Sequence, residues 1–328
     1  MRKIFTIYTV LTLTLLAGCS TGISNKQLLT VNFQPDKTLR YKFKTNRDIE
    51  LDWNSNQSNS AANNKGKITK SSESTEIIVD YTPIEIEPYG LTKIKATCKS
   101  VKVIRKPAKR KNTRRIDAVE HLKGKSFIFS VRANGKIEDR SSLKKLLVKA
   151  GNKAIRKSGN RKIKDPDIID DFIATQWFLW DSISSIENPS EGIKVGQSWN
   201  SILSVPNPMV IRKARNVEYK LDEIQNTEKG DIAVIQSTYS PAKSTPSSWP
   251  IPYTGRFMVS GTYGTLRNYN IVELNGQGQE LFNLDKGITE KYIQEYEAKV
   301  KASFRFPLSG VNPMLKIKQT ITMQLIED

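Results

Sequence analysis

The sequence predicts an α+β fold: a mainly antiparallel β-sheet, curved or half-barrel in shape and possible as two sheets, with a central pair of helices. Long runs of residues alternate between apolar and polar, as at 39–44 and 315–326, which is the period of half-buried strands. Two stretches near the middle of the chain instead repeat apolar residues every three or four positions, as helices do. We therefore expect the helices to pack on the concave face of the sheet.

Four strands are expected before the helices. They cover residues 39–44, 76–81, 91–104 and 125–131. Gly90 and the pair Asn134-Gly135 predict turns, because glycine readily adopts the positive φ angles that tight turns need. Residues 54–67 are rich in Asn and Ser without apolar periodicity, so we expect a flexible hairpin tip or a disordered loop there.

The two helices follow within residues 141–187. The first has an apolar face made of Leu143, Leu146, Leu147, Ala150 and Ala154. The second is expected to begin at Asp165-Pro166, since Asp caps helix N-termini and Pro suits the first helical position. Its wide apolar face, which predicts burial, consists of Ile169, Phe172, Ile173, Trp177, Trp180 and Ile183.

A second meander is expected after the helices, so that residues 27–190 and 191–328 form two units or one continuous sheet. Its strands are predicted from residue 195 and at 217–221, 232–239, 257–266, 271–275, 279–284, 288–306 and 315–326. The Asn-Gly-Gln-Gly run at 275–278 predicts a turn. Four prolines make 241–252 a loop, and the aromatic residues Trp249 and Tyr253 in and after it either pack on the body or contact a partner.

The N-terminus has the parts of a signal peptide. Arg2 and Lys3 precede an almost uncharged apolar stretch at 4–17, whose helical length of roughly 21 Å is short of the ~30 Å hydrocarbon core. The stretch ends in Leu16-Ala17-Gly18-Cys19, which resembles the lipobox of bacterial lipoproteins. We therefore expect residues 1–18 to be a signal peptide.

The lipobox resemblance implies that Cys19 becomes the first residue of the mature chain and carries acyl chains. The polar residues 19–26 would then tether the protein to a membrane of the cell envelope. Ser20, and not Asp, follows the cysteine. In the lipoprotein pattern of a diderm envelope this implies sorting to the outer membrane.

Two further resemblances concern the mature chain. Long antiparallel strands with a central helical insertion look like the periplasmic lipoprotein-carrier superfamily, whose half-barrel sheets hold acyl chains. The segment Gly192-Ile-Lys-Val-Gly196-Gln-Ser-Trp199 is similar to the G-x-x-V-G-x-x-W turn of uncharacterised bacterial surface lipoproteins. Neither resemblance transfers a functional residue to this chain.

The residues that usually carry catalysis are scarce. One His excludes sites that need two imidazoles, and two Cys exclude a thiolate cluster. His121 is therefore expected to be a surface or loop residue, and Cys98, in an alternating segment, a small core residue. Acidic residues at the start of the second helix (Asp165, Asp167, Asp170 and Asp171) are expected from the helix dipole. We expect no catalytic residue, metal or cofactor.

The formal charge of +19 is concentrated in two blocks without acidic residues. Residues 99–115 contain Lys99, Lys102, Arg105, Lys106, Lys109, Arg110, Lys111, Arg114 and Arg115. Residues 141–164 contain Lys144, Lys145, Lys149, Lys153, Arg156, Lys157, Arg161, Lys162 and Lys164. Each block is either a solvated face that aids solubility or a local positive potential that concentrates anions.

Together these features predict a non-enzymatic, lipid-anchored envelope protein whose basic surface binds an anionic lipid, polysaccharide or other partner. Nucleic acid is not an expected partner. The predicted binding residues are Lys106, Lys109, Arg110, Lys111, Arg114, Arg115, Lys145, Lys149, Lys153 and Arg156. Two alternatives remain: a carrier that encloses an apolar or lipid ligand between sheet and helices, and a structural or assembly lipoprotein of an envelope complex.

Overall fold

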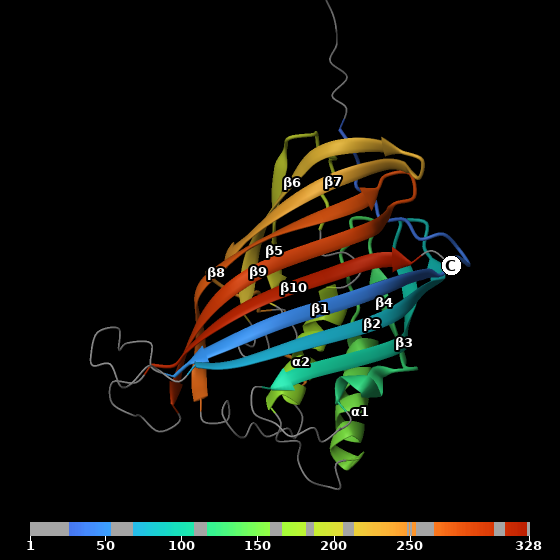
Figure 1. The fold of residues 1–328 in the computed structure, drawn as a ribbon. Helices are drawn as coiled ribbons and strands as arrows, with labels where there is room; N and C mark the ends of the chain where they lie inside the picture. The colour runs from blue at the N-terminus through green and yellow to red at the C-terminus, as the bar shows by residue number, and fades with distance from the viewer. Residues whose placement is uncertain are drawn as a thin grey trace, which may run out of the picture.

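The computed structural model describes residues 26–53, 68–107, 117–157, 166–181, 187–205, 213–247, 249, 251–253, 266–304 and 312–326. These residues form one ten-stranded sheet, two α-helices and a 3-10 helix, η1 (Figure 1). In chain order the elements are β1 (Leu39–Asp52), β2 (Ile68–Ile86), β3 (Thr92–Pro107), η1 (Val119–Leu122), β4 (Ser126–Val131), α1 (Ser141–Lys157), α2 (Pro166–Asp181), β5 (Ser198–Ser204), β6 (Ala214–Thr227), β7 (Gly230–Pro241), β8 (Leu266–Asn283), β9 (Ile288–Phe304) and β10 (Met314–Ile326).

The sheet consists of two meanders that meet in its middle. Its strand order is β4-β3-β2-β1-β10-β9-β8-β7-β6-β5, and all neighbours are antiparallel. The first and last strands of the chain, β1 and β10, therefore pair with each other, with Ile49 opposite Ile317. The two edges are β4 and β5, and the sheet stays open between them.

The predicted mainly antiparallel sheet with a pair of helices is confirmed, as one open sheet, but the fold is mainly β with two short helices and not a helix-rich α+β fold. The strands extend well past the apolar alternation that predicted them: β2 starts at Ile68, whereas its predicted strand covered only 76–81. Polar residues can continue a strand when neighbouring strands supply the hydrogen bonds and one face meets water. On this face, cross-strand ion pairs such as Lys318–Glu297 (2.6 Å) and Lys299–Glu273 (2.7 Å) replace apolar contacts.

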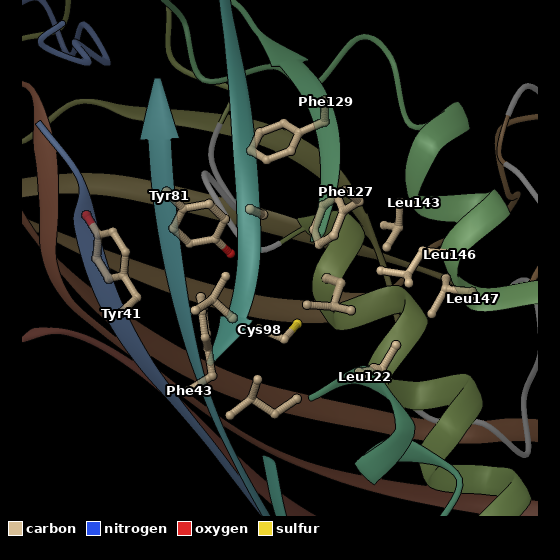
Figure 2. Close-up of a cluster of buried hydrophobic side chains, with 14 of the residues drawn as sticks. Tyr41, Phe43, Tyr81, Cys98, Leu122, Phe127, Phe129, Leu143, Leu146 and Leu147 are labelled. Carbon is tan, nitrogen blue, oxygen red and sulfur yellow. The ribbon is translucent and has the colours of Figure 1, made fainter. Parts of the chain in front are cut away.

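The concave face holds the core, and α1 and α2 cover its β1–β4 half. Figure 2 shows Phe43 on β1, Tyr81 on β2 and Phe129 on β4, with labelled leucines of α1 near Phe127. The Tyr81 ring meets the rings of Phe43 and Phe129 edge-on, at centroid distances of 6.3 and 6.1 Å, an arrangement that aromatic quadrupoles favour. A second cluster lies mainly on strands β6–β10, with Ile49 and Leu51 of β1, and includes Tyr219, Leu221, Val300 and Ile317.

Cys98 confirms its prediction as a core residue. It is fully buried in the cluster of Figure 2, and burial raises the pKa of its thiol to about 12. A thiol with this pKa forms almost no thiolate near neutral pH and is therefore inert.

The predicted turn at 275–278 was wrong, because these residues lie within β8. Gly276 and Gly278 are there because neighbouring tyrosines occupy the space above them: a Cβ on Gly276 would lie 2.6 Å from the Cβ of Tyr296 and 2.7 Å from Cδ2 of Tyr239. Glycine in a strand thus marks a close approach by side chains and not a chain reversal. The two strands predicted at 271–275 and 279–284 are for the same reason one strand.

Most other predicted elements are confirmed. Both helices are present, and α2 begins at Pro166. Gly90 and Gly135 form turns with φ angles of +79° and +85°. On β10, Leu315, Ile317 and Ile321 point into the core as the alternation predicted. The signal peptide, the loop at 54–67 and the strand at 257–265 lie outside the described residues.

Candidate functional site

The helix α1 is positioned by its start and by its apolar face. An oxygen of Asp139 accepts the backbone N–H of Ser141 (2.9 Å), which satisfies one of the free donors at the helix N-terminus. The hydroxyl of Ser142 accepts the N–H of Ile128 (3.1 Å) and so joins the helix to the edge strand β4. Leu143 and Leu147 are both 1% exposed. One face of α1 is thus fixed on the core.

The opposite side of α1 is a continuous basic face. We use this name for Lys144, Lys145, Lys149, Lys153 and Arg156, all of which are exposed. Lys145, Lys149 and Lys153 follow each other at four-residue intervals, which places them on one side of the helix with their Cα atoms roughly 6 Å apart along the axis. A hollow of about 700 Å³ opens along the helix; the described residues that line it are the basic face with Val148 and Asn152.

The basic face differs from the lysines of the sheet in forming no ion pair with described residues, although Asp139, just before α1, interacts electrostatically with Lys145. None of its five residues forms an ion pair within the described part of the chain, whereas convex-face lysines such as Lys70 and Lys318 each bind a carboxylate at 2.6 Å. The first turn of α1 also contains no acidic residue. Apart from the Lys145–Asp139 interaction, no ion pair with described residues neutralises its positive charge.

This charge arrangement does not help the helix. Cations in a first turn oppose the helix dipole, at about 0.3–1 kcal/mol each. The like-charged pairs Lys145–Lys149 and Lys149–Lys153 cost about 0.2–0.5 kcal/mol each. Helix stability therefore does not explain the basic face.

The first basic block only partly matches its prediction. Lys106 is exposed at the end of β3 but is not among the described residues that line the hollow. The predicted binding residues Lys109, Arg110, Lys111, Arg114 and Arg115 lie outside the described residues. Arg105, grouped with them as part of a basic patch, is not a surface cation: its side chain is 13% exposed and binds three carboxylates.

Arg105 belongs to a buried ion network that the sequence analysis missed. Its guanidinium contacts Asp117 (2.7 Å), Asp171 (2.5 Å) and Glu73 (3.2 Å). Arg47 of β1 binds both Glu73 and Asp171. Because Asp171 comes from α2 and the others from β1–β3 and the segment before η1, the network fastens α2 to the sheet.

The pKa values of two carboxyl groups in the network, Glu73 and Asp171, are shifted in opposite directions. Burial raises the pKa of Glu73 well above its usual value, despite Arg47. Burial acts on Asp171 in the same direction, but Arg105 and Arg47 together keep the pKa of Asp171 below its usual value. Because these two pKa shifts are opposite, Glu73 takes up a proton at a higher pH than Asp171 does.

The network continues as a row of polar side chains across the concave face. Arg47 lies directly opposite Glu73 on β2 and Gln319 on β10, and Gln319 lies opposite Tyr296 on β9. The Tyr296 hydroxyl donates to Gln319 (2.6 Å). A cavity of about 20 Å³, lined by Arg47, Asp171 and Gln319 among others, lies between this row and α2 and has room for about one water molecule.

The aromatic residues of the proline-rich loop pack on the body of the protein. Trp249 and Tyr253 both border the core cluster under the helices. Tyr253 exchanges two hydrogen bonds with Gln176 of α2 (2.7 and 2.9 Å), and its hydroxyl donates to Asn152 of α1 (2.5 Å). Gly151 leaves room for the ring, since a Cβ there would lie 2.6 Å from Tyr253 Cε1. Tyr253 therefore links the two helices.

The described residues contain no cluster of three or more His, Cys, Asp or Glu that could hold a metal ion. His121 lies in η1 and is half-buried. No helix within the described ranges is long and apolar enough to cross a membrane.

Comparison with known proteins gives no family. No family model and no curated protein matches the chain. A solved structure described as lipid-protein interactions in lipovitellin is similar over 90% of this chain, with 10% sequence identity and a TM-score of 0.41. The chain spans 26% of that lipovitellin chain. A similarity of this level does not indicate a shared function.

Proposed function

We propose that the protein is a non-enzymatic lipoprotein of the cell envelope that binds an anionic partner through the basic face of α1. The observation that carries the proposal is the line of Lys145, Lys149 and Lys153 along a hollow of about 700 Å³, without ion pairs to described residues. Acylation of Cys19 would keep this face at the envelope, where phosphate and carboxylate groups of lipids and surface polymers are abundant.

The strength of such binding follows from the charge. A basic residue near an anionic surface contributes about 1 kcal/mol. Three aligned lysines therefore contribute about 3 kcal/mol, or roughly a hundredfold in affinity. Each bound cation also releases counterions from a polyanion, so the affinity falls as salt rises.

The carrier alternative needs a cavity that fits an acyl chain. The cavity between sheet and α2 measures about 20 Å³, far below that size. This cavity therefore does not favour a carrier. Docking on an envelope complex stays a prediction.

The proposal is tested by neutralising the aligned lysines. We expect the triple variant Lys145→Gln, Lys149→Gln, Lys153→Gln to bind dextran sulfate, and vesicles rich in phosphatidylglycerol, roughly a hundredfold more weakly than the parent at low salt. Its affinity should also depend less steeply on salt. Binding is measured by titration on the full chain carrying Cys19→Ser, so that acyl chains do not contribute.

The matched control removes the same charge from the convex face. Lys44, Lys301 and Lys316 are exposed there, and their triple replacement by Gln leaves α1 intact. We expect this control variant to bind dextran sulfate and the vesicles at most a few-fold more weakly than the parent. Equal losses in the two triple variants would mean that net charge, and not the basic face, is responsible, and would overturn the proposal.

A further inference from the structure

One end of the sheet is closed by the chain segment that precedes β1. The antiparallel registers place the β2–β3, β6–β7 and β8–β9 turns at this end, and we call these turns together with residues 27–33 the rim. Gln27 exchanges two backbone hydrogen bonds with Ile193 (2.7 and 2.9 Å). Val31 donates to the carbonyl of Ala133 (2.7 Å) and Asn32 to that of Gly287 (2.9 Å).

Residues 27–33 pack closely against the rest of the fold. Gly287 has a φ of +66°, and a Cβ there would lie 2.6 Å from the carbonyl oxygen of Thr30, so only glycine fits beneath the segment. Leu29 and Phe33 are buried in the two cores. The point at which the N-terminal tether reaches the fold is therefore fixed at the rim. Residues 20–26 can span at most about 25 Å, so Cys19 lies within that reach of the rim.

The rim exposes large apolar side chains. Tyr89, at the tip of the β2–β3 turn, is 96% exposed, and Ile84 and Ile86 beside it are 50% and 40% exposed. Ile84 is the extra residue of a β-bulge, which turns its side chain outward. Leu28 of the rim is 59% exposed, and Val195, two residues after the Ile193 that pairs with Gln27, is 51% exposed.

These side chains belong to one continuous end of the molecule. Gly90, next to Tyr89, packs on Ala133, because a Cβ on Gly90 would lie 3.0 Å from the Cβ of Ala133. Ala133 in turn binds Val31 of the N-terminal segment. The net charge at the tip of the β2–β3 turn is small. Glu85 forms an ion pair with Lys93 (2.5 Å), so Glu87 contributes the one remaining negative charge of this tip. Exposed apolar residues beside a predicted lipid anchor are typical of a membrane contact.

We infer that the rim is a second membrane contact, in which Tyr89, Ile84 and Ile86 enter the interface of the bilayer that holds the acylated Cys19. The inference rests on the lipid anchor of the proposed function, but not on its anionic partner. Tyrosine suits this position, because its ring is apolar and its hydroxyl can reach water and headgroups. One acyl-bearing site binds more durably when a protein surface adds a second contact.

The rim and the basic face are distinct surfaces. Beyond β4 the chain turns back along this strand, with Glu138 bonded to Ser130 and Ser142 to Ile128, and α1 continues away from the rim. Figure 1 shows the free end of α1 on the opposite side of the view from the point where the described chain begins. With the rim on the membrane, the basic face points to a partner elsewhere in the envelope.

The test places a fluorophore at the rim of the acylated, full-length protein in vesicles of pure phosphatidylcholine. Tyr89→Cys is labelled with a polarity-sensitive dye; Cys98 is buried and inert, and Cys19 is blocked by its acyl group. We expect emission at shorter wavelength and quenching by spin-labelled lipid. Adding Ile84→Ser and Ile86→Ser should reverse part of the shift.

Ile104→Cys and Val272→Cys provide matched controls, since these residues are 45% and 50% exposed away from the rim. Their labels should report water and escape quenching. If the label at position 89 behaves like these controls, the rim contact is wrong. Because the vesicles are uncharged, this result would leave the basic-face proposal standing.

Discussion

Replacing Arg47 by methionine is expected to lower the free energy of unfolding by about 3–5 kcal/mol. The side chains of Arg47, Glu73 and Asp171 are only 2%, 4% and 7% exposed, so the carboxylates cannot turn to water when the guanidinium is lost. Arg105 alone then faces the remaining acids, and the buried group has an excess negative charge. Urea unfolding monitored by circular dichroism measures the change.

Two variants show whether buried charge is the cause. The Arg47→Met, Asp171→Asn double variant removes one charge of each sign, so it should lose less than the two single variants added together. Lys318→Met removes an exposed ion pair, whose partners are 58% and 53% exposed, and should cost at most about 1 kcal/mol. An Arg47→Met loss no larger than that of Lys318→Met would contradict the network as we describe it.

Glu280→Gln is expected to stabilise the protein at pH 8 by about 3 kcal/mol and to have almost no effect of this kind near pH 4. Glu280 is 3% exposed, and burial raises its pKa from 4.5 to about 7, although the Thr289 hydroxyl donates to it (2.5 Å). The folded state thus favours the protonated acid. Below pH 4.5 Glu280 is protonated in both the folded and the unfolded state, so it does not lower the free energy of unfolding. As pH rises from 4.5 to about 7 the unfolded state ionises first and the free energy of unfolding falls, and above about 7 the full loss is present.

The measurement is the difference in unfolding free energy between parent and variant across pH 4–8. Glutamine keeps an oxygen that can accept the Thr289 proton, and any fixed cost of its amide is the same at each pH. Glu297→Gln is the control, because Glu297 is exposed and its pKa is lowered by the hydrogen bond from Lys318. If the stability difference between Glu280→Gln and the parent does not grow with pH, the folded state does not raise the pKa of Glu280, and the prediction is wrong.

The features of the fold that depend on local pattern were predictable from sequence. The alternation at 315–326 predicted which side of β10 is buried, and the three- and four-residue spacing of Leu143, Leu147 and Ala150 predicted the buried face of α1. The same spacing placed Lys145, Lys149 and Lys153 on the exposed side. The basic face is therefore the part of the candidate site that could be predicted from the sequence.

The rest depends on partners that are distant in sequence. Arg105 was expected at the surface, because its partners Asp171 and Asp117 meet it only after α2 folds onto the sheet. A signal was present: Arg47 and Glu73 occupy the inward positions of otherwise alternating strands. Gly276 was similarly misread as a turn, since the tyrosines above it come from β7 and β9.

Lysine acetylation with and without a bound polyanion tests the central claim most directly. The full chain carrying Cys19→Ser is treated with acetic anhydride in the presence and absence of dextran sulfate, and modification is read at each lysine by mass spectrometry. We predict that the polyanion protects Lys145, Lys149 and Lys153 several-fold, while Lys44, Lys301 and Lys316 on the convex face stay fully reactive. Equal protection of both sets, or protection of the convex face alone, would contradict the basic face as the binding surface.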